Sequence, residues 1–175
     1  MNAPDPADAV LRVGAIGFDE PRTLLARYGL TLIEVADGEG IPGSFWGDTE
    51  AGIIGTTVYA RADTPVHSLL HEACRLIVLP ADKRALVHTD ATDSIEEEDA
   101  TCYLQIVLAG ELPSVGSARL MEDMDRWGYT YRLGSTRAWF ARVPARSAPG
   151  PARTRNSGQH CAGSRPSRPA SRRRA

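Results

Sequence analysis

The sequence predicts an α+β domain, in which a small antiparallel or mixed sheet packs against helices. Two observations support this prediction: short β-rich runs lie in the first 60 residues, and segments with helical periodicity follow them. The chain has 175 residues, 42% of them hydrophobic, which is enough for one domain with a core. We place this domain at residues 13–143, between a loose N-terminal segment (1–12) and a disordered tail (144–175).

The predicted strands belong to the first part of the domain. A short helix at 20–28 ends at Gly29, which can adopt a left-handed cap conformation. A strand at 30–35 follows, and two more strands are expected at 44–47 and 52–60.

Helices make up the rest of the domain. The longest predicted helix after residue 80 begins at Ser94, because Ser94 and Glu97 have the spacing of a capping box. The helices expected after the strands are 65–79, 81–86, 94–109 and 117–127, and a last short element of unspecified type is expected at 135–143.

The helix at 65–79 carries the residues that indicate a function. Thr64 is expected to cap it and Pro65 to occupy its first position. His67, His71 and Arg75 are four residues apart, so they lie along one edge of the helix. A neighbouring edge would face the core with Val66, Leu69, Leu70, Ala73 and Ile77.

The run His71-Glu72-Ala73-Cys74-Arg75 contains most of an H-E-x-x-H motif. In this motif two histidines one turn apart bind a zinc ion, and the glutamate deprotonates the bound water. Arg75 stands where the second histidine would be, and a guanidinium has only N–H donors. We therefore expect a degenerate zinc site, in which His67 is a candidate for the missing ligand.

The order of small sheet, H-E helix and a later helix that begins Glu97-Glu98-Asp99-Ala100-Thr101-Cys102-Tyr103 resembles the ImmA/IrrE type of zincin-like metallopeptidase domain, over about residues 53–110. Over most of residues 29–141 the chain also resembles a group of uncharacterised bacterial proteins, in which the run His-Ser-x-Leu-His-Glu-Ala-Cys ends in His. Arg75 departs from both patterns. The resemblance implies a metal-dependent peptidase or hydrolase that acts on a peptide or small amide.

Carried over by position, the resemblance makes His71 and Glu97 zinc ligands and Glu72 the general base. With His67, the expected ligand set is His67, His71 and Glu97. Glu97 shares a helical edge with the apolar residues at 104 and 108, so we expect it to point nearest the core. Glu98 is the alternative.

Arg75 leaves two functions open. A guanidinium 4 Å from a zinc ion repels it by about 4 kcal/mol per unit charge at an effective dielectric constant near 20. The protein would then be a weakly active or inactive zinc-dependent hydrolase. Alternatively, Arg75 could pair with Glu97 or Glu72 and join the two helices without any metal, in a non-catalytic scaffold or binding domain.

Charge is divided unevenly along the chain. Residues 1–125 contain eight basic and twenty-two acidic residues (−14), whereas residues 126–175 contain twelve basic and no acidic residues (+12). Eight arginines lie at 146–175, in a segment too polar to form a core. Nucleic acid is therefore expected to bind weakly, through this tail, if at all.

Two further expectations concern location and cysteines. No apolar run is long enough to cross a membrane and no signal-peptide pattern opens the chain, so the expected location is the cytoplasm. Cys74 and Cys102 are expected to be small buried residues in helices.

Overall fold

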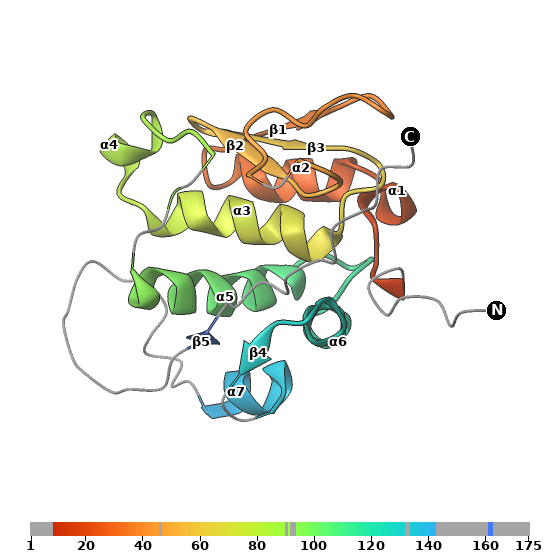
Figure 1. Cartoon of the computed structure of the whole chain (residues 1–175), viewed down its shortest axis with the longest axis vertical. Coiled ribbons are helices and arrows are strands. Elements are labelled where there is room, and N and C mark those ends of the chain that lie inside the picture. Colours follow the sequence, from red (N-terminus) through yellow and green to blue (C-terminus); the bar gives the residue numbers. More distant parts are fainter. Residues whose placement is uncertain are drawn as a thin grey trace, which may run out of the picture.

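The computed structural model describes residues 9–45, 47–89, 91, 94–131, 134–142 and 161–162. Within these residues, helices pack against a small sheet, and the predicted α+β architecture is confirmed. In Figure 1 the sheet and α2 lie above α3, α5 lies below α3, and α6 and α7 lie below α5.

The sheet has three strands in the order β1-β3-β2. β1 (Thr31–Glu34) runs parallel to β3 (Thr57–Ala60), and β2 (Gly52–Ile54) runs antiparallel to β3, so the sheet is mixed, as predicted.

Two predictions about the strands were wrong. The single strand expected at 52–60 is a hairpin, which turns at Gly55, where φ is +58° and glycine is favoured. The strand expected at 44–47 is absent from its described residues: Ser44 Oγ accepts a hydrogen bond of 3.2 Å from the amide of Gly47 and closes a turn. Trp46 lies outside the described residues.

Seven helices lie in the described part of the chain. α1 was not predicted, the short element expected at 135–143 is the helix α7, and the other five agree with the predicted helices to within a few residues. Their bounds are α1 Val13–Ile16, α2 Asp19–Ala26, α3 Val66–Val78, α4 Ala81–Arg84, α5 Ile95–Ala109, α6 Ser117–Trp127 and α7 Thr136–Arg142.

The two long helices begin differently. Ser94 caps α5 as predicted, because its Oγ accepts a hydrogen bond of 3.2 Å from the amide of Glu97. At α3, however, Pro65 is the capping residue, with an extended ψ of 136°. The Thr64 hydroxyl accepts a 2.9 Å hydrogen bond from the amide of Arg61 instead. The predicted Thr64 cap was therefore wrong, because this hydroxyl closes the preceding turn.

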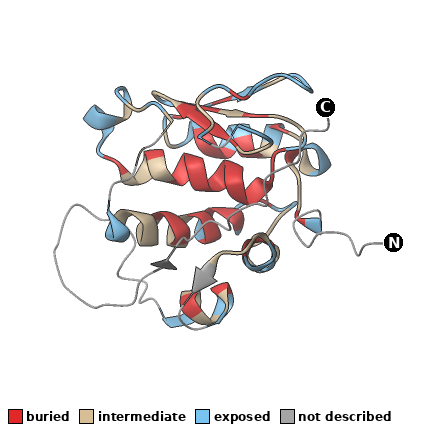
Figure 2. Ribbon diagram, in the orientation of Figure 1, coloured by how far each residue is buried: buried red, intermediate tan, exposed pale blue. Residues whose placement is uncertain are grey.

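α3 is the centre of the molecule. Every residue from 66 to 74 is buried, and Figure 2 shows α3 and much of α5 as buried. The leucines of α3 belong to the hydrophobic core, to which residues of the sheet also contribute. The polar residues His67, His71 and Glu72 are buried as well. Burial of polar groups is costly unless they form hydrogen bonds or ion pairs, so the contacts of these three residues matter for the fold.

The ends of the chain are described in part. β4 (Thr130–Tyr131) pairs antiparallel with β5 (Cys161–Ala162), which places two residues of the predicted tail in a strand. The rest of the tail, like residues 1–8, lies outside the described residues. Cys74 and Cys102 are buried in helices, as predicted. Among the described helices, none combines the length and the apolar character needed to cross a membrane.

Candidate metal centre

His71 is held in one orientation by a buried amide. Its Nδ1 lies 3.1 Å from Oε1 of Gln105 on α5, and both side chains are buried. Gln105 Nε2 donates to the Met124 sulfur on α6 at 3.0 Å, so its Oε1 is the atom that faces His71. Because an amide oxygen can only accept, Nδ1 of His71 carries the hydrogen.

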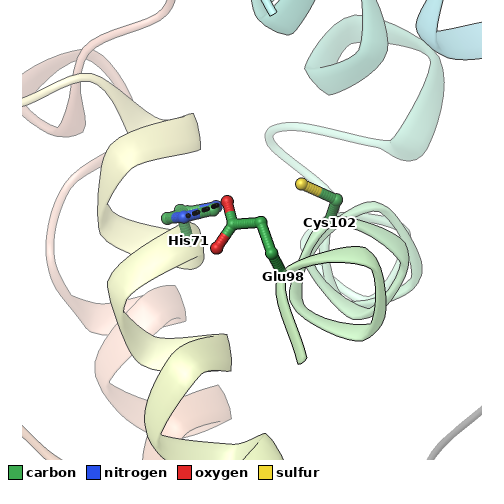
Figure 3. Close-up of side chains that lie close together, drawn as sticks. All are labelled: His71, Glu98 and Cys102. Atoms are coloured by element: carbon green, nitrogen blue, oxygen red, sulfur yellow. Dashed lines mark ion pairs between the residues drawn. The ribbon is translucent and has the colours of Figure 1, made fainter. Parts of the chain in front are cut away.

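The other nitrogen of His71 faces a carboxylate. Nε2 lies 3.2 Å from Oε1 of Glu98, as the dashed line in Figure 3 shows. In a neutral ring with Nδ1–H, Nε2 has a lone pair, and the carboxylate oxygen has lone pairs as well. Two acceptors repel at this distance unless a cation lies between them. Either a proton on Nε2 or a metal ion can be that cation.

Cys102 adds a third potential ligand. It lies four residues after Glu98 and therefore on the same edge of α5. Within the described part of the chain, one ligand atom each from His71, Glu98 and Cys102 lies within 4.8 Å of the others, and this group could hold a metal ion (Figure 3). Cys102 is fully buried and is not part of a disulfide.

Arg75 connects both acidic residues of the site. Its Nη1 lies 3.5 Å from Oε2 of Glu72, and its Nε lies 3.8 Å from Oε2 of Glu98. The exposed fractions of the three side chains are small, 12% for Arg75, 8% for Glu72 and 22% for Glu98. Glu98 thus meets His71 with one oxygen and Arg75 with the other. The expected pairing of Arg75 with Glu72 is present, and its partner on α5 is Glu98.

The structure does not bring His67 into this group. Its ring centroid lies 4.8 Å from that of Trp127 and 5.8 Å from that of Tyr129, beside the end of α6. Among the described residues, neither of its ring nitrogens has a hydrogen-bond partner. Burial lowers the pKa of His67 from 6.5 to about 3, and the charges of His71 and Arg12 add to this shift. His67 is therefore a neutral, packed side chain.

Glu97 also lies outside the group. It is half-buried in the first turn of α5, next to Glu98. The edge of α5 that meets His71 consists of Glu98, Cys102 and Gln105, at i, i+4 and i+7. The prediction preferred Glu97 because apolar residues lie on the same helical edge, with Glu98 as the alternative. The missed signal was the i, i+4, i+7 spacing of three polar or metal-binding side chains on one edge of α5.

The second histidine position of the H-E-x-x-H pattern offers no ligand in this chain. Arg75 offers donors where a ligand is required, and Glu72, the candidate base, is directed to Arg75. The resemblance to zincin-like domains therefore stands on the motif and on the order of elements alone. Comparison with protein-family models, with curated proteins and with solved structures gave no match for this chain.

Proposed function

We propose that this domain is a non-catalytic scaffold or binding domain, in which Arg75 replaces the second histidine of an H-E-x-x-H site and pairs with its carboxylates. The observation that carries this proposal is the contact of Arg75 with Glu72 and with Glu98, on two different helices. These contacts hold α3 against α5 without any metal ion.

The position of Glu72 argues against hydrolysis. A general base has to reach the water from which it takes a proton. Glu72 is buried, and its Oε2 lies 3.5 Å from the Arg75 guanidinium, so the carboxylate is engaged in an ion pair. Zinc-dependent hydrolysis of a peptide or small amide is the competing function.

The contribution of the Arg75 contacts to the free energy of unfolding can be measured as a coupling energy. Removal of one partner from a buried ion pair leaves an uncompensated charge and costs about 3–5 kcal/mol in other proteins. Since Glu98 is partly exposed, we expect Arg75→Met to lower the free energy of unfolding by about 3 kcal/mol. Arg75→Met combined with Glu72→Gln and Glu98→Gln should recover most of this loss. Urea unfolding in the presence of a chelator measures each variant without any contribution from metal.

A matched control is available on the surface. Arg22 pairs with Asp19 at 3.1 Å, but both side chains are exposed. Arg22→Met should therefore change the free energy of unfolding by less than about 1 kcal/mol. If Arg75→Met is as mild as Arg22→Met, Arg75 does not join the helices and the proposal fails.

The catalytic alternative needs a separate assay. The wild-type protein, supplied with zinc, should cleave neither a mixed peptide library nor simple amides above the rate of a Glu72→Gln variant. Cleavage by the wild type that is lost in Glu72→Gln would show that Glu72 acts as a base despite Arg75, and would overturn the non-catalytic proposal.

A further inference from the structure

We infer that His71, Glu98 and Cys102 form a zinc site that joins α3 to α5, with a cysteine thiolate from α5 as the third ligand. The H-E-x-x-H pattern does not predict this site, because the pattern takes its second ligand from α3. The inference goes beyond the proposed function and rests on a different observation, the convergence of these three ligand atoms.

The distances are close to those of a bound zinc ion. Zinc binds nitrogen and oxygen at about 2.0–2.2 Å and sulfur at about 2.3 Å, so the ligand atoms of a tetrahedral site lie roughly 3.3–3.6 Å apart. His71 Nε2 and Glu98 Oε1 are 3.2 Å apart, and no pair of the three ligand atoms is more than 4.8 Å apart. A shift of the Cys102 thiol by about 1 Å completes the site, and the fourth position remains for water.

The residues around His71 also match those of a metal ligand. A histidine that binds a metal generally donates its other N–H to a neighbouring acceptor, which fixes the ring. Gln105 provides that acceptor for Nδ1, and Met124 holds the Gln105 amide in turn. With zinc bound, the lone pair of Nε2 would be directed toward Glu98, where the ion would lie.

Charge balance favours a divalent ion. Arg75 contacts both Glu72 and Glu98 and contributes one positive charge to the group. With Cys102 as a thiolate, the two carboxylates and the thiolate contribute three negative charges, so the four side chains sum to −2, which a divalent cation neutralises. A thiolate selects zinc over magnesium or calcium, which prefer oxygen ligands.

The site is also accessible. Glu98 is 22% exposed, so an ion can reach it from solvent, whereas Cys102 at the back of the site is fully buried. Cys74, the other described helical cysteine, is not part of the group. Bound zinc would cross-link two helices that residues 79–94 separate in the sequence, and would stabilise the folded chain by mass action.

The test uses the full chain after treatment with a chelator. Zinc and cobalt are titrated into the wild type, which should bind one ion per chain, and the cobalt form should show a thiolate-to-cobalt charge-transfer band. Cys102→Ser should lose the band, and Cys102→Ser and Glu98→Gln should each bind zinc about tenfold more weakly or worse. Cys161→Ser and Cys74→Ala are the matched controls and should keep the band.

Folding of each metal-free variant is checked by circular dichroism and thermal unfolding. If Cys102→Ser does not fold, persistence of the band in Cys161→Ser and in Cys74→Ala still assigns it to Cys102. A folded wild type without the band, or a Cys102→Ser variant with wild-type zinc affinity, would overturn the inference. Neither result bears on the Arg75 coupling energy, which is measured with a chelator present, so failure of this inference and failure of the proposed function are distinguishable.

Discussion

Position 75 decides what the polar edge of α3 can do. A zinc ligand there would need a lone pair, and Arg75 offers five N–H donors instead. Its guanidinium contacts Glu72 on its own helix and Glu98 on the next. The arginine at position 75 thus makes the Glu72 carboxylate, which could otherwise serve as a base, the partner of an ion pair.

His67, one turn before His71, makes the stability of the protein depend on pH. Its pKa is about 3 in the folded protein and 6.5 when exposed, so below pH 6.5 the unfolded chain binds a proton that the folded chain does not. The stabilising effect of the neutral ring is complete above pH 6.5 and is lost as the pH falls toward 3. Between pH 7 and pH 5 the wild type should lose about 2 kcal/mol more free energy of unfolding than His67→Leu.

Urea unfolding of both proteins at several pH values measures this difference. His88→Gln changes an exposed histidine and keeps His67, so it is the control and should retain the loss of stability between pH 7 and pH 5. Parallel curves for the wild type and His67→Leu would mean that the His67 ring is hydrated in the folded protein, contrary to its complete burial.

At the scale of elements, the sequence was sufficient to predict the long helices but not the edge of α5 that faces α3. α5 is buried on more than one side: Thr101, Cys102, Gln105, Ile106, Leu108 and Ala109 are all buried. A helix surrounded by protein has no single apolar stripe, so periodicity cannot tell which edge meets which neighbour. The prediction of Glu97 rather than Glu98 as the residue facing the site came from this limit.

The hairpin of β2 and β3 was read as one strand for a related reason. Residues 52–60 are β-rich throughout, and the turn at Gly55 differs from its surroundings in one glycine. The motif His71-Glu72, by contrast, could be found from the sequence, because its spacing is fixed within one helix. The contacts of Gln105 and Cys102 with that helix depend on packing, which spacing along the chain does not encode.

The loop before β2 needs a glycine at position 52. A Cβ atom there would collide with the backbone of Pro42, Gly43 and Ser44, which cannot move aside easily. We expect Gly52→Ala to lower the free energy of unfolding by about 2 kcal/mol or more, because the added Cβ would push the backbone at 42–44 away from β2. Gly40→Ala, in the same connection, adds a Cβ that meets nothing within 4 Å and should be neutral or slightly stabilising. Thermal unfolding of the two variants gives the comparison, and equal midpoints would contradict the tight contact.

The whole molecule is organised around α3, with the sheet on one side and α5 on the other (Figure 1). The apolar face of α3 forms the core with the sheet, and its polar edge forms the candidate site with α5. This arrangement places the site between two helices, so an ion pair or a bound metal there acts on the packing of the entire domain. Any ligand of this site should therefore change the stability of the whole chain.

The charge of the chain changes sign at about residue 125. The −14 of residues 1–125 opposes polyanion binding by the domain, whereas the eight arginines of residues 146–175 favour it. We expect the full chain to bind heparin or single-stranded DNA weakly at low salt and to lose this binding by about 0.2 M salt, because the contacts are ionic.

A chain that ends at residue 143 should not bind heparin or single-stranded DNA at any salt concentration. Its free energy of unfolding should differ from that of the full chain by less than about 1 kcal/mol, since β5 adds only Cys161 and Ala162 to the described fold. Fluorescence anisotropy across a salt series measures the binding, and replacement of Arg172, Arg173 and Arg174 by serine is the intermediate control. Binding that survives the truncation would place the polyanion site on the domain itself, against its acidic charge.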